Sequence, residues 1–120
     1  MYQPTWGCRA GFSGLMNDAP GKMWASKTQG VGAWISLRLV QKYKFTKFEY
    51  INRNNEKERN SKLEVSFDEG IDSQEYSLED TYTTSTFTLT TPVVSQRIKF
   101  TIKTVYGTIN NGGGFNVYGE

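Results

Sequence analysis

The side chains that most often carry catalysis are scarce in this sequence. It contains no histidine, so the commonest general base and metal ligand is missing, and neither a Ser–His nor a Cys–His pair can form. The single cysteine, Cys8, has no activating partner nearby in the sequence, and it rules out an internal disulfide and a cysteine-rich zinc site. The sequence therefore predicts a protein that is not an enzyme.

Acidic residues are the remaining candidates for chemistry, because two carboxylates are enough for glycoside hydrolysis. The candidates are Asp68, Glu69, Asp72, Glu79 and Asp80. All of them stand in predicted turns or at the borders of turns, where acidic side chains are common for structural reasons. We therefore keep hydrolysis only as a minor alternative.

Planar polar side chains make the segment 52–60 a candidate for binding. Arg53, Asn54 and Asn55 carry guanidinium and amide groups that suit bidentate hydrogen bonds to sugar hydroxyls, carboxylates or protein backbone. The alternative is a solvated hairpin tip with no ligand.

A second candidate lies near the N-terminus, where Trp6, Arg9 and Phe12 form an aromatic and basic cluster. Such a cluster would stack on a sugar ring or seat a protein partner, and the alternative is that Trp6 plugs one end of the fold. Tyr106 and Asn110 would complete the same surface.

The elements that must position these residues are β-strands. From Trp34 onward apolar and polar residues alternate, which is the period of a strand with one buried face. The clearest triplets are Ile35, Leu37 and Leu39; Leu63, Val65 and Phe67; and Ile98, Phe100 and Ile102. Turn-forming clusters separate these runs, among them Thr91-Pro92 and Gly107 to Gly114. The pattern predicts an all-β jelly-roll β-sandwich of about eight antiparallel strands, with residues 1–120 as a single domain.

Composition narrows the class of partner. With 14 Lys and Arg against 12 Asp and Glu, the net charge is only +2 and the sign alternates along the chain, which argues against a nucleic-acid binder. Only Leu15, Met16 and Met23 suit insertion into a lipid surface, so we do not expect membrane binding. The oligomeric state is not predicted.

Localisation stays open at this point. The lone cysteine and the absence of a signal peptide at the start favour an intracellular protein, whereas an excised module would be compatible with an extracellular one.

The order of short motifs is similar to that of the discoidin or galactose-binding-like superfamily, the coagulation factor C-type domains. The motifs are Trp24-Ala25-Ser26, Trp34-Ile35-Ser36-Leu37-Arg38-Leu39, Phe45 to Ile51, Leu63 to Gly70, and Gly114 to Gly119. The resemblance implies a jelly roll that binds partners through loops at one end. Trp24 and Trp34 stand where a first core strand would begin, and we expect both rings in the core.

The same resemblance implies a structural Ca²⁺, because many such domains hold one in the loop before the motif that begins at Trp24. Asn17 and Asp18 occupy that loop, and Glu120 would close the site if the two termini meet. Calcium prefers several hard oxygen ligands, which carboxylates, amides and carbonyls provide. The alternative is a turn in which these side chains bind their own backbone.

Taken together, these features lead to one preferred function and a close alternative. The preferred function is a non-catalytic recognition module that binds a carbohydrate or glycan-like ligand through its end loops. The alternative is an intracellular protein-interaction subunit of the ciliary or ubiquitin-ligase-complex type with the same fold.

The calcium site gives a direct prediction. If Asn17, Asp18 and Glu120 hold the ion, calcium will raise the melting temperature relative to chelator, because a ligand that binds only the folded state stabilises it. Thermal melts with calcium and with chelator measure this, and Asp18→Asn is expected to abolish the difference. Identical melting temperatures in the two conditions would rule the site out.

Overall fold

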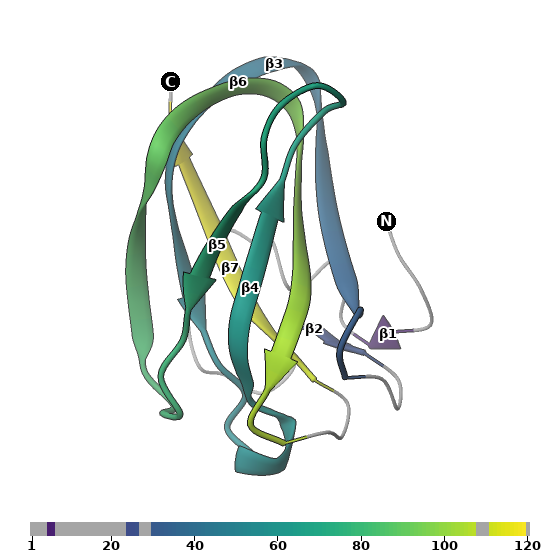
Figure 1. The fold of residues 1–120 in the computed structure, drawn as a ribbon, viewed down its shortest axis with the longest axis vertical. Coiled ribbons are helices and arrows are strands. Elements are labelled where there is room, and N and C mark those ends of the chain that lie inside the picture. Colours follow the sequence, from purple (N-terminus) through teal and green to yellow (C-terminus); the bar gives the residue numbers. More distant parts are fainter. Residues whose placement is uncertain (1–4, 7–23, 27–29, 108–110, 120) are drawn as a thin grey trace.

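The computed structural model describes residues 5–6, 24–26, 30–107 and 111–119, and these form an all-β protein (Figure 1). The strands are β1 (Thr5–Trp6), β2 (Trp24–Ser26), β3 (Trp34–Ile51), β4 (Asn60–Ser66), β5 (Gln74–Ser77), β6 (Thr84–Val105) and β7 (Gly112–Gly119). One 3₁₀ turn, η2 (Glu56–Glu58), lies between β3 and β4. Within the described residues, no helix is long and apolar enough to cross a bilayer.

Two long strands, β3 and β6, each run through both layers of the sandwich. Every described pairing is antiparallel, and the strand order is β1-β2-β7-β3-β6-β4-β5. The start of β3 and the end of β6 lie with β4 and β5 in one layer, which we call the front layer; the end of β3 and the start of β6 lie with β7 in the other, the back layer. Figure 1 shows both long strands bending over at the top. The predicted jelly-roll β-sandwich is confirmed.

The bends occur where the pairing of β3 with β6 loses its register. Arg38 pairs with Arg97, but the next partners are Tyr43 and Ser95, so β3 has extra residues at this point. Val40, one of them, is 97% exposed, which fits a strand that leaves one layer before it enters the other. The sequence predicted separate strands here and a turn at Thr91-Pro92; that turn prediction is wrong, because both residues lie inside β6.

A set of hydrogen bonds holds the bend of β6 against the end of β4. The backbone N–H of Gln96 donates to the Asp68 carboxylate at 3.1 Å. The guanidinium of Arg97 donates to the Phe67 backbone carbonyl at 2.6 Å. Ser95 donates to the Arg97 carbonyl at 2.9 Å. The bond from Gln96 is the largest of several causes that lower the pKa of Asp68 below its usual value.

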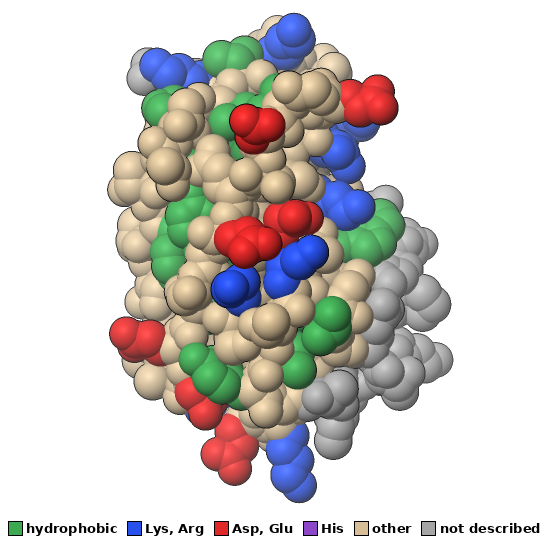
Figure 2. Space-filling model, viewed as in Figure 1, with side chains coloured by type: hydrophobic (Ala, Val, Ile, Leu, Met, Phe, Trp, Pro, Cys, Tyr) green, Lys and Arg blue, Asp and Glu red, His purple; other side chains and the backbone are tan. Residues whose placement is uncertain are grey.

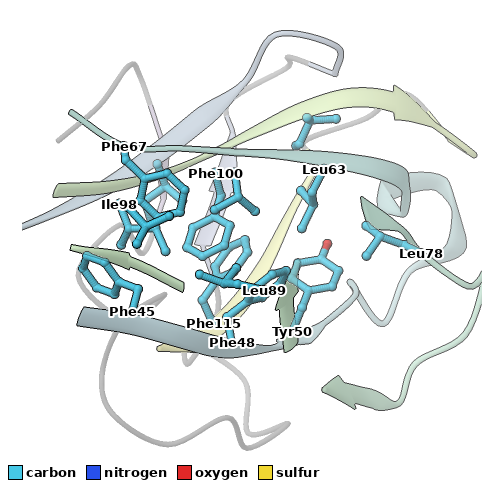
Figure 3. Packing of buried hydrophobic residues seen from close by; sticks show 14 of the residues in the cluster. Phe45, Phe48, Tyr50, Leu63, Phe67, Leu78, Leu89, Ile98, Phe100 and Phe115 are labelled. Atoms are coloured by element: carbon cyan, nitrogen blue, oxygen red, sulfur yellow. The ribbon is translucent and has the colours of Figure 1, made fainter. Parts of the chain in front are cut away.

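The core lies between the two layers and is rich in aromatic rings (Figure 3). Phe100 from the front layer stacks on Phe115 from the back layer, with ring centroids 4.2 Å apart, and Phe48 meets Phe100 edge-on at 5.1 Å. Two of the predicted triplets are fully buried, but in the first only Ile35 is, since Leu37 and Leu39 approach the bend and are half-buried.

Trp34 differs from its predicted place in the core. It is half-buried and is not part of the buried cluster, and the Lys99 ammonium lies 4.5 Å from the centroid of its ring. Trp34 and Ile35 are neighbours in a strand, so their side chains point to opposite faces, and Ile35 is the one that enters the core. The side chain of Trp24 lies outside the described residues.

The outer face of the front layer is charged but balanced. Lys62 lies 3.8 Å from Glu75, and Lys103 lies 3.9 Å from Glu64. Figure 2 shows acidic and basic side chains next to each other on this face. Pairs this exposed contribute little stability, but they leave no large field of one sign on the face.

A buried polar network replaces apolar packing at the lower end of the core. The Asn60 side-chain amide donates to the Tyr50 hydroxyl at 2.7 Å and to the Gly112 backbone carbonyl at 2.6 Å. The Tyr50 hydroxyl lies 3.0 Å from the side-chain oxygen Oδ1 of Asn52. Burial raises the pKa of Tyr50 well above its usual value, so its hydroxyl stays protonated and can donate. Asn52 also accepts from the Asn60 N–H at 2.9 Å. The network joins β3, β4 and β7.

This network explains the glycine at 113, in a run of three glycines at 112–114 that the sequence predicted as part of a turn. That prediction is wrong, because the glycines are buried residues of β7. A Cβ atom on Gly113 would stand 2.3 Å from Cε1 of Tyr50, and the residue has a φ of +148°. Glycine is therefore required where the backbone of β7 passes over the Tyr50 ring.

The contact at Gly113 predicts a large loss of stability on substitution. We expect Gly113→Ala to cost about 1–3 kcal/mol more than Gly70→Ala, because it adds crowding against Tyr50 to the strain of a positive φ. Gly70 is the matched control, since it also has a positive φ, of +86°, and a Cβ atom there would meet nothing within 4 Å. Urea denaturation measures both variants, and equal losses would contradict the packing argument.

The lowered pKa of Asp68 predicts a pH-dependent effect. A depressed carboxyl pKa adds stability that is present above the unfolded pKa of about 3.9 and disappears as the pH falls through the folded value. Asp68→Asn should therefore be less stable than the unchanged protein at pH 7, and the difference should shrink on acidification below pH ~4. Denaturation at several pH values checks this, with Glu69→Gln as an exposed control in the same loop. A difference that does not vary with pH would contradict it.

Candidate functional site

Three connections meet at one end of the sandwich, at the bottom of Figure 1. They are the β3–β4 connection 52–59, the β5–β6 connection 78–83, and the β6–β7 connection, of which Tyr106, Gly107 and Asn111 are described. We call this surface the loop end. It stands directly on the buried network of Tyr50 and Asn60.

Arg59 holds the three connections together. Its guanidinium donates to the Arg53 carbonyl at 2.9 Å, to the Asn54 carbonyl at 3.0 Å, and to both the backbone carbonyl and the carboxylate of Asp80 at 3.2 Å. The planar fork of arginine suits such divergent acceptors, whereas a lysine would satisfy fewer of them. This side chain is only 14% exposed, so it fixes the shape of the loop end from beneath the surface.

The backbone of Arg59 makes a second set of bonds to the β6–β7 connection. Its carbonyl accepts from the Tyr106 N–H at 3.0 Å, from the Gly107 N–H at 3.2 Å, and from the Asn111 amide at 3.1 Å. Gly107 fits against the backbone of Lys57 so closely that a Cβ atom there would stand 2.5 Å from it. The loop end is therefore held in one arrangement by buried and half-buried bonds.

Arg53 and Asn55 both form bonds within their own loop. Arg53 bonds Oε1 of Glu58 through two nitrogens, each at 2.7 Å, and the Asn55 side chain caps η2 by accepting from the Lys57 N–H at 3.0 Å. Caps of this type stabilise short helical turns. Both side chains thus contribute to the structure of the loop end.

Tyr106 presents an aromatic ring at the loop end. It is 49% exposed, and its hydroxyl donates to the Leu78 carbonyl at 2.6 Å. That bond fixes the outer end of the ring, and the bond of the backbone N–H to the Arg59 carbonyl fixes the main chain of the residue. An exposed aromatic ring in a fixed orientation can pack against the apolar face of a ligand.

Polar groups accompany the ring on the neighbouring segments. Asp80 is 50% exposed, and its Oδ2 has no hydrogen bond within the described part of the chain. The side chain of Asn54 is exposed and likewise makes no bond to a described residue. No group of three or more His, Cys, Asp or Glu side chains that could hold a metal ion occurs among the described residues.

Four of the residues predicted to bind ligand share this end of the fold. Arg53, Asn54, Asn55 and Tyr106 come from two connections that are far apart in the sequence, and the fold brings these together. Whether they bind a ligand stays a prediction.

Trp6 lies in β1, and its backbone pairs with Ala25, which pairs in turn with Gly112. This places its backbone at the side of the sheet where β7 begins, and its side chain is outside the described residues. Arg9 and Asn110, and the predicted calcium ligands Asn17, Asp18 and Glu120, also lie outside the described residues.

Arg59 and the role of Asp80 were not predicted from the sequence. Arg59 was one of several charged residues in 52–60, and Asp80 was a carboxylate at a turn border. Their bond joins residues 21 positions apart, and no local pattern marks such a contact. Only the pairing of the strands reveals it.

Comparison with solved structures supports the fold. A fucose-binding module of Streptococcus pneumoniae, SpX-3, superposes with a TM-score of 0.74 at 14% identity, covering 100% of this chain and 92% of that chain. A module of Clostridium perfringens, CpGH89CBM32-5, in complex with GalNAc-β-1,3-galactose, gives 0.66 at 19% identity, covering 80% and 74%. The family 32 carbohydrate-binding module of C. perfringens NanJ, in complex with galactose, gives 0.66 at 18%, covering 92% and 81%.

At these identities the likeness establishes the fold alone, and that fold is the galactose-binding-like jelly roll which the motif order predicted. No curated protein matches the chain. A family model described as a domain of unknown function, DUF7402, matches residues 7–116. Because that match covers nearly the whole chain, the chain belongs to the DUF7402 family, with a galactose-binding-like fold.

Proposed function

We propose that this domain is a non-catalytic carbohydrate-binding module that holds a saccharide at the loop end. The observation that carries the proposal is the Tyr106 ring, which is half exposed and is fixed through Leu78 and Arg59. A sugar ring has an apolar face that packs on an aromatic side chain, and hydroxyls that need hydrogen-bond partners around it.

Asp80 and Asn54 supply such partners. The Asp80 carboxylate would accept a sugar hydroxyl through Oδ2, while its Oδ1 stays on Arg59. A carboxylate held in this way loses little freedom on binding, which lowers the entropic cost of association. Asn54 offers both a donor and an acceptor from an exposed side chain.

Arg59 has a positioning role in this proposal. It contacts the backbone beneath Asn54 and Asp80 and accepts from the Tyr106 N–H, so it aligns all three without reaching a ligand itself. Sites supported by such buried contacts keep their geometry in the absence of ligand.

The structural neighbours suggest the class of sugar. Modules with this fold are described as binding fucose, galactose and GalNAc-β-1,3-galactose, which are all uncharged saccharides. We therefore expect an uncharged sugar of this kind as the ligand at the loop end.

The proposal predicts that Tyr106→Ala weakens sugar binding at least about tenfold, because the apolar platform is lost. Tyr106→Phe keeps the ring but removes its bond to Leu78, so its loss should be smaller. A glycan array followed by calorimetry on the best hit measures both variants.

Tyr118→Ala is the matched control, because Tyr118 is also exposed, at 37%, but lies in β7 with its hydroxyl 2.5 Å from Glu49. It should bind as the unchanged protein does. Sugar binding at the loop end that survives in folded Tyr106→Ala would contradict the proposed site. A blank array, with a specific protein partner captured instead, would favour the protein-interaction alternative.

A further inference from the structure

A groove opens on the side of the sandwich away from the loop end. It lies between Ile71 to Gln74, at the end of the β4–β5 connection and the start of β5, and the part of β6 from Thr90 to Val94. Its volume is about 550 Å³. That volume is within the range of small-molecule sites in proteins.

The groove results from a bulge in β6. Phe45 and Lys47 are two positions apart in β3, but their partners Val93 and Thr88 are five positions apart in β6, so β6 carries extra residues here. This part of β6 is the free edge of the back layer, where no other described strand pairs with it. Bulges at sheet edges displace the strand and redirect its side chains.

Gln74 prevents the bulge from exposing unpaired backbone. Its side chain accepts from the Thr90 N–H at 2.8 Å and donates to the Thr91 carbonyl at 3.0 Å. Pro92, which follows in the same bulge, has no backbone N–H that needs a hydrogen-bond partner. The groove is therefore a stable feature, because the Thr90 N–H and the Thr91 carbonyl both have a hydrogen-bond partner.

Three other polar side chains of the groove make no such bonds, whereas the Ser73 hydroxyl lies 3.5 Å from a carboxylate oxygen of Glu64. The Asp72 carboxylate and the hydroxyls of Thr90 and Thr91 form no hydrogen bond or ion pair with any described residue. At the loop end, by contrast, Arg53 and Arg59 make internal bonds. The groove thus keeps one carboxylate and two threonine hydroxyls for another molecule.

The lining also has an apolar side and no basic residue. Ile71 packs against the core, Val93 is only 7% exposed, and Pro92 lies beside them. Without Lys or Arg in the lining, and with the Asp72 carboxylate present, an anionic ligand is disfavoured. An apolar surface beside one carboxylate and several hydroxyls fits the two kinds of surface on an uncharged sugar.

We propose that this groove is a second saccharide site, which takes an uncharged sugar independently of the loop end. The class of ligand in this inference rests on the proposed function, whereas the location of the site does not. Thr84 pairs with Ile51 beside the loop end, and Thr90 is six residues further along the strand, about 20 Å away at ~3.3 Å per residue. One monosaccharide cannot bridge that separation, so the domain would be bivalent.

The test is a titration with galactose and with fucose, followed by calorimetry and by amide NMR shifts. Sugar concentrations extend to the millimolar range, because the lining holds no aromatic ring. The unchanged protein should show two sites per chain, with shifts at residues 72–74 and 90–91 as well as at the loop end. Tyr106→Ala should keep the groove shifts, and the double variant Asp72→Asn/Thr91→Val should weaken them at least about tenfold.

Glu69→Gln is the control, because Glu69 is an exposed carboxylate of the same connection that does not line the groove. It should leave both sites unchanged. The second site is overturned if the groove residues do not shift, or if the double variant binds with unaltered stoichiometry. If Tyr106→Ala has no effect while the double variant abolishes binding, the groove stands and the loop-end function fails.

Discussion

The pairing of β3 with β6 is the constraint on which the rest of the structure depends. Each strand runs through both layers, so their hydrogen-bonded pairing, or ladder, extends from one layer into the other, with a shift of register at the bend. This pairing fixes how the two sheets lie on each other. The core rings of Phe48, Phe100 and Phe115 meet only because the ladder sets that arrangement. The bonds of Asp68 and Ser95 at the bend of β6 hold the point at which the ladder is weakest.

At the other end, polar bonds take the place that apolar packing has in the middle. Tyr50, Asn52 and Asn60 bury amide and hydroxyl groups, which is unfavourable unless they are hydrogen-bonded. Their bonds to the backbone of β7 then dictate glycine at 113. Arg59 extends the same principle to the surface, since its bonds convert three separate connections into one rigid end.

The fold was predictable because burial alternates along each strand, and Leu63, Val65 and Ile98 occupy the places which that pattern gives them. The pattern failed where pairing rather than burial decides. Pro92 lies within a bulge, and Gly113 is a strand residue that is glycine because its backbone packs on the Tyr50 ring. The polar, turn-forming residues of segment 52–60 correctly predicted that Arg53 and Asn54 lie in a loop. The contact of Arg59 with Asp80 and the groove at Asp72 depend on which strands are neighbours, and no short stretch of sequence records that.

The bond of Gln74 to the edge of β6 also bears on how this protein behaves at high concentration. A free sheet edge is a template for the strands of other molecules, and such pairing leads to aggregates. Gln74 occupies the N–H of Thr90 and the carbonyl of Thr91, and Pro92 offers no N–H at all. The side chain that satisfies the backbone at the groove thus also blocks β-strand addition along this stretch of the edge, so one glutamine serves both the local order of the bulge and resistance to aggregation.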